Sequence, residues 1–71
     1  MKWEAIVGAN IRRLRKARGL TQEALAHEAG AAMRYIAGVE RGEENPSLRI
    51  LVKIAEALKV EPASLLARDR V

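Results

Sequence analysis

Apolar residues recur at helical spacing in five stretches of the chain, and glycine, proline or polar residues separate these stretches. In the first stretch, Val7, Ile11, Leu14 and Ala17 would form one stripe along a helix. Glycine often follows the last turn of a helix, because it adopts positive φ at little cost. We therefore predict an all-α fold with helices over about residues 3–18, 21–29, 32–41, 47–58 and 62–68.

Each predicted helix contributes one face to a candidate core. Trp3 and Ile6 lie beside the first stripe, and we expect them to cap one end of the core. The inward positions of the next three helices are Leu25, Ala26 and Ala29, then Ala32, Ile36 and Val39, then Leu48, Leu51, Ala55 and Leu58.

The middle of the chain predicts two short helices joined by a tight turn. The Thr21 hydroxyl can cap the first of them, and Gly30 can end it. The second runs from about Ala32 to Arg41. Two short helices joined by such a glycine-containing turn are typical of the helix-turn-helix motif, whose second helix enters the major groove of DNA.

Several linked stretches resemble the Cro/Xre-type, lambda-repressor-like DNA-binding domains. They read IRRLRKARGLTQEALAHEAG, then YIAGVERGEENPSL, then LVKIAEAL, and the resemblance spans roughly residues 7 to 66. It implies a compact five-helix fold with the helix-turn-helix at helices two and three. It also implies a small transcriptional regulator of the phage-repressor or restriction–modification controller type.

The same resemblance implies an ion pair between Arg15 and Glu40 that joins the first helix to the third. Such a pair is physically reasonable, because Glu40 follows Val39 on the inward edge of its helix and a carboxylate there needs a partner. The alternative is that Arg15 and Glu40 are independent surface charges.

The resemblance also places a group of residues against DNA phosphates. Gln22 stands in the first turn of the second helix, where the helix N-terminus would face the DNA backbone, although it could instead be a solvent-exposed residue. Tyr35 could hold a phosphate through its hydroxyl or pack its ring against the second helix. The predicted phosphate contacts are Thr21, Gln22, Tyr35, Arg41 and Asn45.

The outer face of the third helix is the candidate for base contacts. If Ile36 and Val39 point inward, the opposite face carries positions spaced at i, i+3, i+4 and i+7. Bases are contacted mainly from the N-terminal part of such a helix. We therefore predict base contacts from Met33, Arg34, Ala37 and Gly38.

Arg34 is the strongest of these candidates, because arginine most often reads guanine O6 and N7. Met33 and Ala37 could contact thymine methyl groups. Gly38 would let the helix backbone approach either DNA or the first helix. Ala32 departs from the Ser or Thr that relatives usually carry at the helix start, and alanine forfeits about 1 kcal/mol of capping.

The positive charge is concentrated in the half that contains the motif. Residues 1–42 hold eight basic and four acidic side chains, whereas residues 43–71 hold five of each, for a net charge of +4. A basic half fits a surface that faces phosphates. Taken alone, however, the charge favours a solvated, arginine-rich helix face over a phosphate-facing surface.

Composition argues against several other classes of protein. Seventy-one residues predict one domain near the lower size limit for a self-sufficient core. The absence of cysteine and the single histidine leave no metal-ligand set, and no catalytic constellation or Gly-rich phosphate loop is present. We expect no enzyme activity, no cofactor and no metal. Without an apolar run long enough to span a bilayer or an apolar signal peptide, we expect a cytoplasmic protein.

Surplus apolar residues near the C-terminal end suggest a homodimer. Two-fold dimers suit DNA, because half-sites about 34 Å apart match one helical turn. The alternative is that these residues complete a small monomeric core. The predicted interface residues are Ile50, Val60, Leu65 and Leu66, with one of the two adjacent leucines exposed.

These features predict a sequence-specific regulator of transcription that binds double-stranded DNA. Its third helix would enter the major groove, and a homodimer would bind an operator with two half-sites. The alternative is an antitoxin or other protein-interaction module of the same fold, whose main partner would be a toxin.

Overall fold

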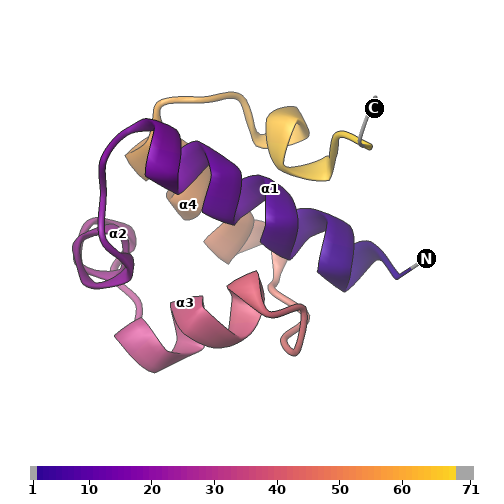
Figure 1. Ribbon diagram of the computed structural model, residues 1–71, viewed down its shortest axis with the longest axis horizontal. Coiled ribbons are helices and arrows are strands. Elements are labelled where there is room, and N and C mark those ends of the chain that lie inside the picture. Colours follow the sequence, from indigo (N-terminus) through magenta and orange to yellow (C-terminus); the bar gives the residue numbers. More distant parts are fainter. Residues whose placement is uncertain (1, 69–71) are drawn as a thin grey trace.

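Four α-helices and one 3-10 turn form the fold of the computed structural model, which describes residues 2–68 (Figure 1). The all-α prediction is confirmed, and the first four helices begin and end within one residue of the predicted bounds. The elements are α1 (Trp3–Ala17), α2 (Gln22–Ala29), α3 (Met33–Glu40), α4 (Leu48–Leu58) and η1 (Pro62–Leu66).

The last element differs from the prediction of an α-helix reaching residue 68. It is a 3-10 helix that stops at Leu66, and Ala67 is extended. The buried amide of Asn10 in α1 donates to the carbonyl oxygens of Leu65 at 2.9 Å and of Ala67 at 2.7 Å. Because a side chain from α1 satisfies these carbonyls, the chain has no need to continue the helix.

Local capping explains where the central helices begin and end. The Thr21 hydroxyl accepts from the Ala24 amide at 3.0 Å, as predicted, and the Ser47 hydroxyl accepts from the Ile50 amide at 3.2 Å. Gly30 ends α2 with a φ of +69°. Ala32 precedes α3 in an extended conformation and offers no capping side chain. Ala32 is also exposed, so its predicted place in the core was wrong.

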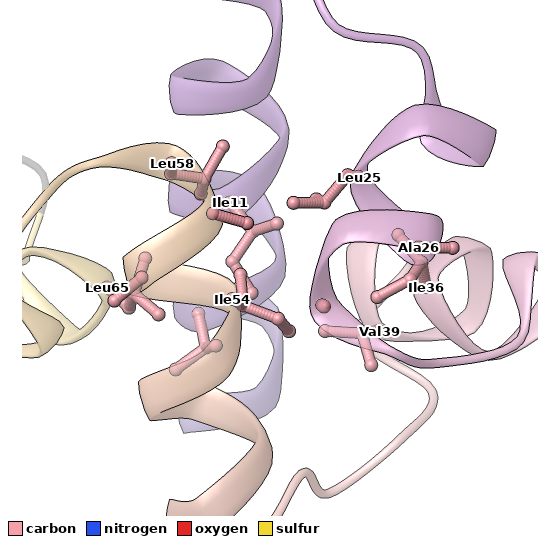
Figure 2. Packing of buried hydrophobic residues seen from close by; sticks show 12 residues of the cluster. Ile11, Leu25, Ala26, Ile36, Val39, Ile54, Leu58 and Leu65 are labelled. Carbon is pink, nitrogen blue, oxygen red and sulfur yellow. The ribbon is translucent and has the colours of Figure 1, made fainter.

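The core lies where the five elements meet, around the middle of α1 (Figure 2). In Figure 1, α3 and η1 lie on opposite sides of α1, and α2 packs against both α3 and α4. This arrangement places the helix-turn-helix on one side of the molecule and η1 on the other. The largest fully buried side chains are Ile11, Leu25, Ile36, Val39, Ile54, Leu58 and Leu65.

Besides Ala32, three residues predicted for the core are exposed: Trp3, Ala17 and Leu48. Leu48 is 73% exposed, whereas Ile54 in the same helix is fully buried. Leu48 is the first residue of α4, and helical side chains point toward the N-terminus, so its side chain extends past the core. Trp3 is half exposed for the same reason at the start of α1, with the Arg68 guanidinium 5.7 Å from its ring centre.

The closest approach between α1 and α3 occurs at Gly8. A Cβ atom built on Gly8 would overlap the carbonyl oxygen of Val39 and lie 2.8 Å from that of Glu40. One of the two alternatives for Gly38 was a close approach to the first helix, but Gly8 has that role. Because α1 and α3 touch through backbone atoms here, α3 can occupy this position only if residue 8 is glycine.

Candidate nucleic-acid interface

The turn between α2 and α3 is held by backbone hydrogen bonds. The Gly30 amide donates to the backbone carbonyl of His27 at 3.2 Å, and the Ala31 amide donates to that of Ala26 at 2.9 Å. Ile36 and Val39 then anchor α3 in the core. The turn and these anchors fix the outward direction of the opposite face of α3.

A buried ion pair joins α3 to α1. The Arg15 Nε donates to Glu40 Oε2 at 2.6 Å, and its Nη2 donates to Oε1 at 3.0 Å, with 10% and 1% of the two side chains exposed. The remaining Arg15 nitrogen donates to the Leu20 carbonyl at 2.8 Å. A two-point contact of this kind fixes the relative orientation of the two helices as well as their distance.

Gln22 takes part in the same network, which the sequence did not indicate. Its Nε2 donates to Glu40 Oε1 at 3.0 Å, so Glu40 binds residues from both α1 and α2. Among residues 2–68, every buried side-chain nitrogen or oxygen has a hydrogen-bond partner. The first turn of α2, with its free backbone N–H groups, is thereby fixed relative to α3.

The N-terminal half of α3 is open to solvent. Met33 is 48% exposed, Arg34 is exposed and Ala37 is partly exposed. Gly38 is different, because it is buried beneath the side chain of Glu44. The prediction that Gly38 lies on the open face therefore needs correction. The open face of α3 consists of Met33, Arg34 and Ala37.

The C-terminal end of α3 carries a cation flanked by carboxylates. The exposed Arg41 donates to Glu43 at 3.1 Å. This hydrogen bond is the main cause that raises the pKa of Arg41 and lowers the pKa of Glu43. Both side chains remain accessible, so the pair can open when a stronger anion approaches.

The other predicted phosphate residues lie around this end and at the start of α2. Tyr35 packs partly against the core, and burial followed by the charge of Glu44 raises the pKa of its hydroxyl. Both sequence-based alternatives for Tyr35, packing and a phosphate contact, are compatible with this partial burial. Thr21 and Asn45 are exposed.

The predicted dimer surface is only partly exposed. Leu65 is fully buried in the core, so its placement at an interface was wrong, and Leu66 is 46% exposed instead. Ile50 and Val60 pack partly against the core. Leu66 lines a shallow hollow of about 120 Å³ together with Trp3 and Leu51. The apolar surface therefore centres on Leu66 and the start of α1.

Sequence reasoning missed three residues that position η1 and α3. Asn10 binds the carbonyl oxygens at the end of η1, Gly8 allows α3 to approach α1, and Glu44 covers part of α3. Gly8 gave no signal beyond a glycine inside a helical stretch. No helix within residues 2–68 is long and apolar enough to cross a membrane, and no group of three metal-ligating side chains occurs there.

The fold and the open face of α3 define a helix-turn-helix protein of the Cro/Xre type. A family model described as helix-turn-helix, HTH_3, matches residues 11–65. The chain belongs to this helix-turn-helix family of transcriptional regulators.

One relative in sequence and two solved structures support this assignment. The uncharacterised HTH-type transcriptional regulator y4dJ of Sinorhizobium fredii is 38% identical over 65 residues, covering 92% of this chain and 84% of the relative. The restriction–modification controller protein C.AhdI from Aeromonas hydrophila has a TM-score of 0.85 at 45% identity, covering 87% of this chain and 94% of that one. The biofilm regulator SinR, solved in complex with DNA, has a TM-score of 0.82 at 35% identity, covering 86% and 98%.

Proposed function

We propose that this protein is a sequence-specific regulator of transcription that inserts α3 into the major groove of double-stranded DNA. The observation that carries the proposal is the exposed N-terminal half of α3, oriented by the buried contacts of Glu40 with Arg15 and Gln22. Arg34 is the long, multi-donor side chain on this face, and guanine is its preferred base. Met33 and Ala37 would contact thymine methyl groups beside it.

Phosphate contacts would come from both ends of the motif. At the start of α2, backbone N–H groups, the Thr21 hydroxyl and the second amide hydrogen of Gln22 are suited to one phosphate. At the end of α3, Arg41 would leave Glu43 and bind a second phosphate, with Tyr35 and Asn45 as further contacts there. The excess of positive charge within residues 1–42 supports this orientation.

The substitution Arg34→Ala should abolish most of the discrimination between an operator and random DNA. One bidentate arginine–guanine contact contributes about 1–3 kcal/mol, so we expect the affinity ratio to fall by roughly 5- to 150-fold for each such contact. Weak, salt-sensitive binding should remain, because the phosphate contacts stay intact. The measurement uses an operator selected from a random duplex pool, titrated beside a scrambled duplex.

Arg12→Ala is the matched control, since Arg12 is also an exposed arginine but lies in α1. It should leave the affinity ratio unchanged. An intact ratio in Arg34→Ala would remove Arg34 as the base reader, and failure of the selection to enrich any sequence would contradict sequence-specific binding.

A homodimer would place two copies of α3 on successive half-sites. The proposed contact is the surface around Leu66, because Leu66 exposes apolar area beside a hollow that Trp3 and Leu51 also line. Ile50 and Val60 stay predicted interface residues, since each is partly exposed. Homodimerisation would double the number of base contacts, which a single short helix needs for useful specificity.

Leu66→Lys should shift the protein toward the monomer, because the substitution places a charge in an apolar contact. The mass measured by light scattering at tens of micromolar should fall toward that of one chain. Ala17→Lys is the control, since Ala17 is exposed at the far end of α1. A wild-type protein that is already monomeric at this concentration, with or without operator DNA, would contradict the homodimer.

A further inference from the structure

Glu44 places its side chain across the outer side of α3. Gly38 is buried although it lies on the side of α3 opposite Ile36. A Cβ atom built on Gly38 would lie 3.0 Å from the Cγ and 3.3 Å from the Oε2 of Glu44. Glu44 thus fills the space that a side chain at position 38 would need.

The glycine at position 38 is best explained by this contact. Glycine inside a helix is less favourable than alanine by about 1 kcal/mol. The three atoms nearest to the built Cβ all belong to the Glu44 side chain, whereas the close approach to α1 is made by Gly8. Gly38 therefore lets the Glu44 side chain lie flat against α3.

The carboxylate of Glu44 lies close to two groups that the proposed function assigns to phosphates. Tyr35 and Arg41 are three residues before and after Gly38, so they flank it on one side of the helix. The charge of Glu44 contributes, after burial, to the raised pKa of Tyr35, and it makes the smallest contribution to the raised pKa of Arg41. A negative charge here opposes an approaching phosphate.

We propose that Glu44 acts as a built-in electrostatic brake on DNA binding, holding a carboxylate over Gly38 where the DNA backbone would approach Tyr35 and Arg41. This inference rests on the proposed function. The repulsion acts on phosphates, which every duplex carries, so it weakens binding to operator and random DNA alike. The base contacts of Arg34 then decide where the protein stays bound.

The test compares the wild-type protein with Glu44→Gln on the selected operator and on a scrambled duplex over a series of salt concentrations. We expect Glu44→Gln to bind both duplexes about three- to tenfold more tightly near 0.1 M salt. The slope of log affinity against log salt should steepen by up to about one unit, as expected for one less opposing charge.

Glu61→Gln is the matched control for net charge. Glu61 is exposed at the start of η1, which packs on α1 and α4 on the other side of the molecule from α3 (Figure 1). Since charges separated by more than about 10 Å are screened at this salt, its effect should stay below about twofold.

A second measurement checks the position of the carboxylate without DNA. The chain has one tyrosine, so the ultraviolet absorbance of phenolate reports Tyr35 alone. The nearby negative charge of Glu44 disfavours phenolate and raises its pKa. Glu44→Gln should therefore lower the pKa of Tyr35, and Glu61→Gln should leave it unchanged.

Three results would overturn the brake while leaving the proposed function intact: an unchanged affinity in Glu44→Gln, an equal gain in Glu61→Gln, or an unchanged pKa of Tyr35. A selective loss of operator affinity would also overturn it, because Glu44 would then accept a hydrogen bond from a base amino group. If neither the wild type nor the variant binds DNA, the proposed function fails as well.

Discussion

Gly8→Ala should destabilise the protein by about 3 kcal/mol, the upper end of the usual penalty for overpacking. The added methyl group would overlap the Val39 carbonyl oxygen and crowd that of Glu40, and these backbone atoms cannot move without displacing α3. For a domain of 60–100 residues, this corresponds to a Tm lower by roughly 12–24 °C. Thermal and urea unfolding followed by circular dichroism would measure the change.

Gly38→Ala is the matched control, because it adds the same methyl group to another helical glycine. Its neighbour is the flexible side chain of Glu44 rather than backbone. The better helix propensity of alanine, about 1 kcal/mol, should offset the crowding and leave Tm nearly unchanged. Equal effects of the two substitutions would show that backbone contact at Gly8 does not determine the packing of α1 on α3.

Glu40→Ala should lower the free energy of unfolding by about 3–5 kcal/mol, because it leaves the Arg15 guanidinium in a buried position without its carboxylate. Gln22 would lose its hydrogen-bond acceptor at the same time. We expect a loss of DNA affinity to accompany the loss of stability, since the α2 and α3 orientations both depend on Glu40. Chemical unfolding and duplex titration at low temperature would separate the two effects.

Glu43→Ala is the control for removing a glutamate from an ion pair. Glu43 and Arg41 are exposed, so water replaces the lost contact and Tm should scarcely change. The double substitution Arg15→Leu with Glu40→Leu should recover part of the stability, because no unpaired charge is left inside. An unchanged unfolding curve in Glu40→Ala would contradict a structural role for this pair.

Much of the fold followed from the sequence because its signals are local. The stripe of Val7 and Ile11, the caps at Thr21 and Ser47, and the glycine at position 30 depend on residues a few positions apart. Such signals predicted four helices and the helix-turn-helix. Local signals could not predict that the segment beginning at Pro62 forms a 3-10 helix and ends at Leu66. Its end depends on the amide of Asn10, far away in the chain, which donates to the carbonyl oxygens of Leu65 and Ala67.

The candidate site also has features that the sequence predicted and features that it did not. The outer position of Arg34 followed from periodicity, and the pairing of Arg15 with Glu40 was implied by family resemblance. The burial of Leu65 rather than Leu66 was not decided by pattern, since adjacent apolar residues in a short turn satisfy either assignment. The cover of Gly38 by Glu44 depends on how the loop after α3 folds back, which no periodicity describes.

By itself, the sequence determined the helical fold, the position of the helix-turn-helix and the concentration of basic charge around it, because these depend on spacing and composition. Only the tertiary structure decided that the backbones of α1 and α3 meet at Gly8, that Gln22 joins Arg15 in binding Glu40, and that a carboxylate lies on the outer side of α3. The reason is that such contacts join residues distant in sequence, and their geometry is set by the packing of whole helices.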